Sequence, residues 1–153
     1  MGIKATATKT ADEIAHLSML EQFHTIWQQI TDENGNPYEY TLEDTEFTPP
    51  DRRDPPIDTN WARFVIRPNT SNQRSLSGRR FERRGNLGIQ VFVTISIGIG
   101  EMSRITSLLK RGLEAKRLSN GVRFFGVEQQ NLGVSNGYLQ TNLVVEYLWL
   151  ENK

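Results

Sequence analysis

The residues of this sequence best suited to a chemical role are five arginines that lie close together. Between positions 74 and 84 the only acid is Glu82, and every basic residue is an arginine: Arg74, Arg79, Arg80, Arg83 and Arg84. A guanidinium group presents a planar fork of donors that fits carboxylate and phosphate oxygens, and it gives up its hydration more easily than an ammonium group. The cluster therefore predicts an interface, with nucleic-acid phosphates or with carboxylates of another polypeptide. A solvated hairpin arm is the alternative interpretation.

A second charged segment, which is acidic, lies upstream of the arginines. Residues 31–58 contain nine acids against Arg52 and Arg53, with two Pro-Pro pairs and few aliphatic residues. Prolines remove backbone donors and favour extended geometry, so we expect residues 31–60 to form a long extended connection without regular strand pairing. The same segment of a neighbouring copy is one partner that would suit the arginine cluster. The acids that we assign to such an interface are Glu43, Asp44, Glu46, Asp51, Asp54 and Asp58.

The formal net charge of zero conceals this separation of charge. Lysine plus arginine number 18 and aspartate plus glutamate number 18. By segment, residues 1–59 carry 4 basic and 12 acidic side chains, residues 60–123 carry 13 and 3, and residues 124–153 carry 1 and 3. Neutrality argues against a protein that simply coats nucleic acid. The segmental pattern instead fits a chain that meets further copies of itself through surfaces of opposite sign.

Few residues of the sequence suit catalysis or metal binding. There is no cysteine, which excludes disulfides, thiolate nucleophiles and Cys-ligated metal sites. The two histidines, His16 and His24, lie in one predicted helix without a metal-ligand motif, and we interpret them as packed residues. The acids at 43–46 lack the spacing of an EF-hand loop. We therefore expect no catalytic residue, no cofactor, no metal ion and no enzymatic activity.

A glycine pair stands where a phosphate-binding turn would be placed, between a predicted strand and a predicted helix. Gly98 and Gly100 match two glycines of such a motif, but position 103 holds a serine where the third glycine is needed. We interpret the pair as easing the reversal from strand to helix.

The elements that position these residues follow from periodicity and turn residues. A capping-box pattern at 10–13 is followed by apolar residues at steps of three and four as far as Ile30, and this predicts an N-terminal helix. Turn residues at 34–37 end it. We expect residues 1–9 to be flexible and the whole chain to form one domain. No apolar run approaches the roughly 20 residues of a membrane helix, and no signal segment is expected at the N-terminus.

The second part of the chain predicts strands around another helix. Strand composition covers 61–67 and stops at Pro68, a further strand is expected within 73–83, and Gly85 and Asn86 suggest a tight turn. Strict alternation of β-branched residues then predicts a strand over 89–99. The remaining expected elements are a helix over 101–118 closed by a left-handed cap at 120–121, a strand over 122–127 and a strand over 138–150.

This order predicts an α+β fold, with a mostly antiparallel sheet packed on one face by two helices, a long acidic Pro-containing loop and an Arg-rich hairpin. The last strand ends almost at the end of the sequence. We expect a sheet edge there that is open to pairing with another chain.

Three short runs stand in a distinctive order. They are Trp-Ala-Arg-Phe-Val-Ile at 61–66, Arg-Arg-Gly-Asn-Leu-Gly-Ile-Gln-Val-Phe-Val at 83–93, and Gly-Ile-Gly at 98–100 before a helix. This order resembles the tail terminator and tail-completion proteins of long-tailed bacteriophages, in which a strand reading roughly R-x-G-x-x-x-V-Q-V-F leads through glycines into a second helix. The matching positions are architectural, and the long acidic segment at 31–58 departs from the family pattern.

The resemblance implies a structural virion protein at the head–tail joint. Such a protein forms a ring, typically six-fold, that caps the tail tube, ends tail polymerisation and docks to the neck. The implied partners are further copies of the chain, a tail tube protein and a head-completion or neck protein, with DNA passing through the ring as a further candidate and no membrane. The implied location is the head-proximal end of the virion tail, after assembly in the host cytoplasm.

The alternative function is a nucleic-acid-binding module that contacts the phosphate backbone through the basic 60–84 segment. Its binding would weaken steeply with salt, because counterions are released when phosphates are neutralised. The residues that would make these contacts are Arg63, Arg67, Arg74, Arg79, Arg80, Arg83 and Arg84.

Overall fold

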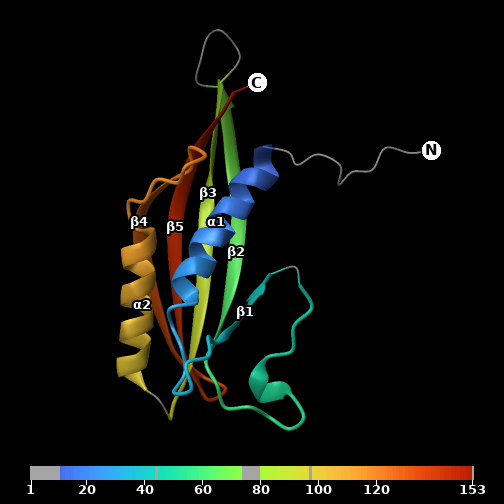
Figure 1. The fold of residues 1–153 in the computed structure, drawn as a ribbon, viewed down its shortest axis with the longest axis vertical. Helices are drawn as coiled ribbons and strands as arrows, with labels where there is room; N and C mark the ends of the chain where they lie inside the picture. The colour runs from blue at the N-terminus through green and yellow to red at the C-terminus, as the bar shows by residue number, and fades with distance from the viewer. Residues whose placement is uncertain (1–10, 44, 74–79, 97, 153) are drawn as a thin grey trace, which may run out of the picture.

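The computed structural model describes residues 11–43, 45–73, 80–96 and 98–152. These residues contain two helices, five strands and one short 3-10 turn (Figure 1). In chain order the elements are α1 (Ala11–Trp27), β1 (Glu39–Leu42), η1 (Pro50–Arg52), β2 (Trp61–Gln73), β3 (Arg80–Thr94), α2 (Ile99–Leu113), β4 (Arg123–Ser135) and β5 (Tyr138–Asn152). The residues expected to form a flexible N-terminus, 1–9, lie outside the described part of the chain.

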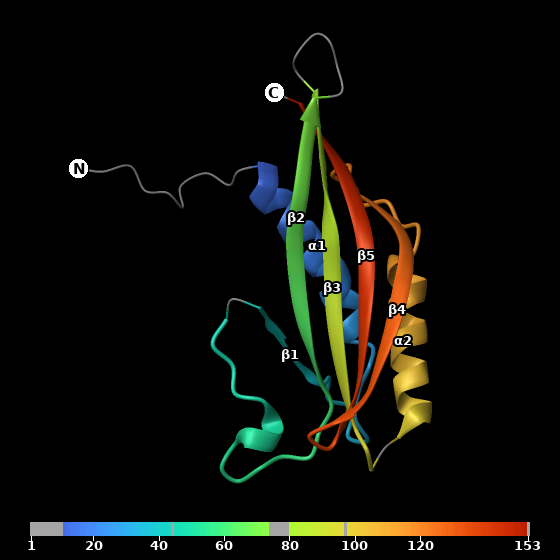
Figure 2. The same ribbon diagram turned by 180° about the vertical axis from the view of Figure 1, so that it is seen from behind.

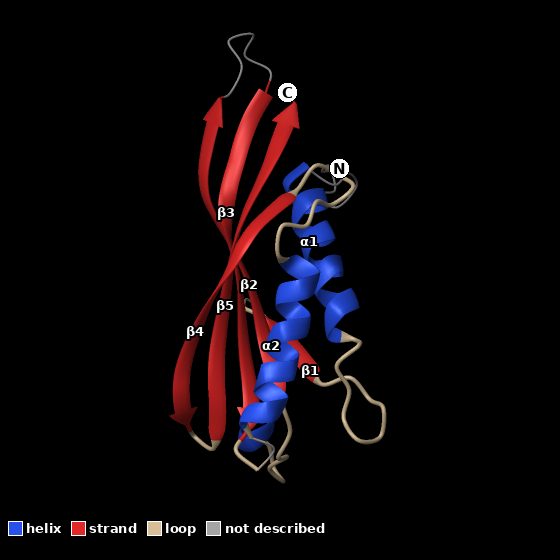
Figure 3. Cartoon of the chain, turned by 90° about the vertical axis from the view of Figure 1, so that its left-hand side faces the viewer, coloured by secondary structure: helices blue, strands red, loops and turns tan. Residues whose placement is uncertain are grey.

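The strands form one sheet in the order β1-β2-β3-β5-β4. β1 runs parallel to β2, and every other neighbouring pair is antiparallel. Both helices cover the same face of the sheet, while the opposite face carries no helix (Figures 2 and 3). The predicted α+β fold with two helices on one face is therefore confirmed. Neither described helix combines the length and the apolar character that crossing a membrane requires.

α1 buries the apolar stripe that its periodicity predicts. Met19 and Phe23 are 0% exposed and Trp27 is 1% exposed. The ring of Phe23 stacks on the ring of Phe64 in β2 with centroids 4.9 Å apart, and the Trp27 indole donates a hydrogen bond of 2.8 Å to the carbonyl oxygen of Tyr38. The indole bond satisfies a polar group that burial would otherwise leave unpaired. The expected capping residue, Thr10, lies outside the described residues.

The centre of the core lies where β3 and β5 run side by side. Their helix-facing side chains alternate with residues of the open face, as the period of a strand requires. Ile89 is paired with Leu143, and Leu87 is paired with Val145. These side chains and their neighbours on the same face are buried, namely Leu87, Ile89, Val91 and Val93 of β3 and Leu143, Val145, Tyr147 and Trp149 of β5.

The two helices meet at a glycine. The Gln22 side chain of α1 donates a hydrogen bond of 2.9 Å to the carbonyl oxygen of Gly112 in α2. A β-carbon at Gly112 would overlap the side chain of Ile26. The glycine therefore permits the close packing of α1 against α2.

The arginine hairpin is longer than predicted. β2 does not stop at Pro68 but continues to Gln73, and Gly85 and Asn86 lie inside β3 instead of forming a turn. The register shifts between Pro68 and Thr70, and such a bulge accommodates the missing proline N–H without ending the strand. The predicted break between two strands is thus wrong, and one long hairpin takes its place.

Two further expectations about strands are wrong. Residues 39–42 of the acidic connection do pair regularly, because β1 adds to the edge of β2 with Glu39 opposite Trp61. In addition, β5 is an inner strand between β3 and β4, so it presents no open edge along its paired length. The edges of the sheet are β4 on one side and β1, with the upper part of β2, on the other.

The boundaries around α2 also differ from those predicted. β3 ends at Thr94, so the alternation beyond it does not continue as strand, and α2 begins at Ile99 after Gly98, whose φ is +89°. The helix ends at Leu113, before Ala115 with φ +56°. Gly121 is indeed left-handed with φ +91°, but it belongs to a separate turn in which its N–H donates to Leu118.

Candidate functional site

The predicted arginines and acids lie at opposite ends of the molecule. The end of β3 that bears Arg80, Arg83 and Arg84 lies beside the end of β2 at the top of the described sheet in Figure 1, while the connection 45–60 lies in the lower half. Arg74, Arg79 and Asp44 lie outside the described residues, and Arg80 is described only as part of the backbone of β3. Within one chain, the described members of the two sets are therefore not brought together.

Arg84 is already engaged by acids of its own chain. Its Nε donates to a carboxylate oxygen of Glu82, and its Nη1 donates to Glu146 of β5 at 3.1 Å. Glu82 is only 2% exposed, and its hydrogen bond raises the pKa of Arg84 above the ordinary value. Arg83, the neighbouring cluster residue, is half-buried. Arg84 therefore has a structural role at the base of the hairpin.

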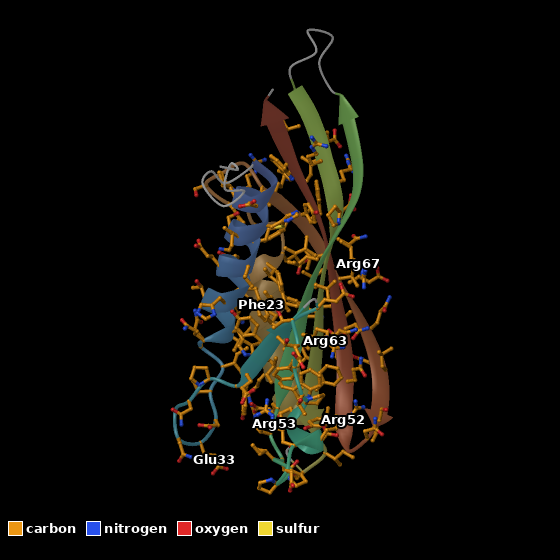
Figure 4. The ribbon with its side chains drawn as sticks, turned by 90° about the vertical axis from the view of Figure 1, so that its right-hand side faces the viewer. Phe23, Glu33, Arg52, Arg53, Arg63 and Arg67 are labelled. Carbon is orange, nitrogen blue, oxygen red and sulfur yellow. The ribbon has the colours of Figure 1, made fainter. Side chains whose placement is uncertain are left out.

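The acidic connection is held against the sheet by two arginines. Arg53 donates two hydrogen bonds to the carboxylate of Glu39, at 2.9 and 2.6 Å, and this bonding lowers the pKa of Glu39. Arg67 of β2 pairs with Glu43 at 2.5 Å. Figure 4 shows Arg67 on the side of the sheet away from α1. Because both arginines belong to the same chain, part of the acidic charge is neutralised internally.

The other described acids of the predicted interface are less engaged by arginines of the same chain than Glu43 is. Asp58 accepts a hydrogen bond of 3.1 Å from the Ser96 hydroxyl. Glu46 and Asp54 are exposed, and within the described part of the chain neither makes an ion pair. Asp51 is half-buried within η1 and contributes to raising the pKa of Tyr138, after the larger effect of burial. Glu46 and Asp54 are thus the predicted acids best placed to meet another molecule.

The open face of the sheet carries a polar row that the sequence analysis did not identify. Arg63, Gln90, Asn142 and Gln130 lie side by side across the four long strands. The Arg63 guanidinium donates to the Gln90 side chain at 3.4 Å and lies 5.5 Å from the centre of the Trp61 ring. Arg63, Gln90 and Asn142 line one hollow of about 300 Å³, and the amides of the row offer both donors and acceptors.

The histidines are packed residues. The Nδ1 atom of His24 is 2.8 Å from the hydroxyl of Tyr40, and the two rings meet edge to face. Among the described residues, no three histidine, aspartate or glutamate side chains gather closely enough to hold a metal ion.

One edge of the sheet, formed by β4, exposes apolar side chains. Leu132 is 53% exposed and Val134 is 60% exposed. Gly133, which stands between them, lines a hollow together with Ile99 at the start of α2, and Ile99 is 77% exposed. We call Ile99, Leu132 and Val134 the β4 patch.

The opposite edge carries an apolar groove between α1 and the strands β1 and β2. Its volume is about 420 Å³, and it opens where β1 ends and the edge of β2 becomes free. Leu17 and Leu42 at its walls are 39% and 36% exposed. We call it the α1 groove, and its apolar walls are Leu17, Leu20, Leu42, Phe64, Val65 and Ile66.

The two sides of the molecule also differ in charge. Between residues 11 and 46, which build the α1 side, there is no lysine or arginine. The described acids there are Glu13, Glu21, Asp32, Glu33, Glu39, Glu43 and Glu46. On the side of α2 and β4, six basic residues outnumber Glu101, Glu114 and Glu128; they are Arg104, Lys110, Arg111, Lys116, Arg117 and Arg123. Only the strand order shows that these surfaces lie at opposite edges of the sheet (Figure 1).

Comparison with known proteins shows the fold alone. No protein-family model matches the chain, and no curated protein sequence matches it. A solved structure is similar to it with a TM-score of 0.65 and 14% sequence identity, over 95% of this chain and 97% of that chain. This α+β arrangement therefore occurs in another protein over nearly its full length.

Proposed function

We propose that this chain is a structural virion protein of the tail-terminator type. It forms a ring at the head-proximal end of a long-tailed bacteriophage tail, caps the tail tube, ends tail polymerisation and docks to the neck. It acts through binding and has no enzymatic activity. The partners in this proposal are further copies of the chain, the tail tube protein and a head-completion or neck protein.

The observation that carries the proposal is that the two edges of the sheet differ in charge and in surface shape. A closed ring requires a heterologous interface, in which one patch meets a different patch on the next copy. The α1 side is acidic with an apolar groove, whereas the α2 and β4 side is basic with exposed apolar residues. Such a protomer can repeat around a ring with the same contact each time.

The two ends of the molecule support the same proposal. The hairpin of β2 and β3 lies at one end of the long axis and the acidic connection at the other (Figure 2). A ring of such protomers has two chemically different rims, which suits a component that joins a tail tube to a neck. In this proposal the arginine cluster of the sequence, Arg74, Arg79, Arg80, Arg83 and Arg84, lies at the rim that meets a partner or DNA passing through the ring, with Arg84 itself held by Glu82 and Glu146.

The proposal is tested by assembly and by the effect on tails. The purified protein should form a discrete ring oligomer, six-fold in the family that the sequence resembles, in light scattering and electron microscopy. Tails assembled without it should be overlong. A protein that stays monomeric at all concentrations and is missing from purified tails would contradict the proposal.

One observation favours a second candidate function, binding to a nucleic-acid backbone. The register places Arg63, Arg67 and Arg84 on the same helix-free face of the sheet. Because Glu43, Glu82 and Glu146 neutralise two of these arginines, the ring function has the stronger support. Retention of the protein on duplex DNA at low salt, lost steeply as salt rises, would support this second function. Absence of retention at low salt would remove it.

A further inference from the structure

The edge strand β4 is only partly protected against pairing with another chain. Sheet edges are normally guarded by prolines, lysines, bulges or covering loops. β4 reads RFFGVEQQNLGVS, with neither proline nor lysine, and its two register shifts leave residues 127–131 regular between them. Residues 115–117 cover the outer side of β4 at its start, through a bridge from Arg117 to Arg123 and hydrogen bonds to Phe124 and Phe125. Among the described residues, none pairs with the outer side of β4 beyond these positions, so the edge over residues 127–135 is available to a partner strand.

The apolar residues of the β4 patch lie at the end of this edge. Single exposed apolar residues are ordinary on protein surfaces, whereas a cluster marks a contact surface. Leu132 and Val134 flank Gly133, and Gly133 and Ile99 line the same hollow. The patch therefore consists of two exposed apolar residues at the end of β4, beside a hollow that its third residue, Ile99 of α2, also lines.

The α1 groove at the other edge has the complementary shape and chemistry. Its volume of about 420 Å³ falls within the roughly 300–1,000 Å³ of cavities that accept side chains or small ligands. Its walls are mainly aliphatic, with His16, Glu43 and Thr45 at the border. A few aliphatic side chains of a partner would fill it and exclude water.

The directions of the edge strands fit a repeated contact. β2 and β4 run in opposite directions, because each long strand is antiparallel to its neighbour. A rotation about a ring axis to which the strands are moderately tilted changes each strand direction only slightly between neighbouring copies, so β4 of one copy would meet β2 of the next antiparallel. Antiparallel pairing is the arrangement already used by the four long strands.

We propose that copies of this chain associate side by side, with the β4 patch of one copy seated in the α1 groove of the next. The inference rests on the proposed ring function and names its contact surface. The basic α2 and β4 side then faces the acidic α1 side, and this complementary charge selects a second copy as the occupant. Register across the sheet places Phe64 level with Gln129, so Val134 is five residues further along β4. Because of the bulge before Gly133, Val134 is opposite Leu139 of β5, only four positions from Leu143. At roughly 3.4 Å per residue, the contact offsets neighbouring copies by about 14 Å along the strands, which a closed ring accommodates by tilting its strands relative to the ring axis.

Charge substitutions at the two surfaces test the contact. L132E/V134E places carboxylates against the acidic side, and L17E/L42E places them in the groove. We expect each double variant to weaken self-association by about tenfold or more, because each removes a central apolar contact. The matched control is I57E, which changes a residue that is 45% exposed and lies outside both surfaces. Far-UV circular dichroism and thermal unfolding establish that each variant is folded.

Mixing the two double variants distinguishes a heterologous contact from a symmetric one. Each variant retains one intact surface, so the mixture should form heterodimers while neither variant assembles alone. The absence of cysteine permits a second measurement that does not alter the charge. V134C mixed with L42C should be joined by a short bismaleimide cross-linker into a heterodimer, whereas V134C alone should not be joined.

The outcomes separate this inference from the proposed function. Rings of normal stability in both Glu variants, or efficient V134C homodimers, would overturn the side-by-side contact and leave the ring function standing. A wild-type protein that never associates and is missing from purified tails would overturn both.

Discussion

Gly85 lies where β2, β3 and β5 approach too closely for any side chain, and replacing it tests this account of the sheet. A β-carbon at Gly85 would lie 2.5 Å from the carbonyl oxygen of Arg67 and 2.5 Å from the hydroxyl oxygen of Tyr147. Non-bonded carbon and oxygen atoms need more than 3 Å. The backbone of Arg67 is fixed by its strand, and Tyr147 is only 1% exposed, so neither group can move without disturbing the core.

We therefore expect Gly85→Ala to destabilise the protein by about 3 kcal/mol, the upper part of the range for overpacked cores. For a domain of this size the melting temperature should fall by about 6–12 °C. The assay is thermal and urea unfolding followed by circular dichroism. Gly88→Ala is the matched control, because its β-carbon would meet nothing closer than 3.8 Å in the same strand. Equal melting temperatures for the two variants would refute the close-packing argument.

Three further predictions concern the core and the titratable groups. Leu143→Ala should lower the free energy of unfolding in urea by about 2–5 kcal/mol, since the side chain is 0% exposed. Because Arg53 lowers the pKa of Glu39 from its ordinary value of 4.5, the stability from this pair is present above that pH and is lost as pH falls through the lowered pKa. Arg53→Ala should therefore reduce the loss of stability in acid, as urea midpoints at several pH values would show. If Arg53→Ala lost as much stability in acid as the wild-type protein does, this assignment would be contradicted. Burial raises the pKa of three tyrosines above the ordinary value of 10.0, namely Tyr38, Tyr40 and Tyr138. Their phenols should therefore ionise at higher pH than free tyrosine in an absorbance titration. Stability should decrease as pH rises from 10.0 through the raised pKa values, because the unfolded state loses these protons first.

The elements with strong periodicity could be predicted from the sequence. The stripe of α1 and the alternation of β3 and β5 each identify a buried face, because burial on one face fixes the period of the residues that form it. These patterns were sufficient for the fold class and for the side of the sheet that the helices cover. They also place the apolar residues of α2 against the sheet, where Ile105 and Leu109 are buried.

The errors arise where distant contacts override local preference. Pro68 and Gly85 are turn residues by local chemistry, but a bulge accommodates the proline, and the ring of Tyr147 requires the glycine inside a strand. β1 was missed because its partner, β2, lies beyond a long connection and the pair is parallel. Such pairing leaves little local pattern in the sequence.

The candidate site was predicted only in part. The charged segments could be identified from composition, but the internal pairs of Arg84 with Glu82 and Glu146 depend on strand register. The β4 patch and the α1 groove depend on the strand order, which no local pattern reveals. The sequence predicts an open edge at β5, whereas the open edge belongs to β4. The order of strands along the chain does not determine which strand is outermost in the sheet.

The even number of long strands determines how the two outermost long strands are oriented relative to each other. An even number of mutually antiparallel strands gives a sheet whose outermost long strands point in opposite directions, whereas an odd number gives outermost strands that point the same way. Insertion of a complete hairpin at one edge would preserve this opposition, and loss or gain of a single antiparallel strand would abolish it, whereas a strand added in parallel, as β1 is added to β2, preserves it. Variation between related proteins that share this contact should therefore add or remove antiparallel strands at the edges in pairs.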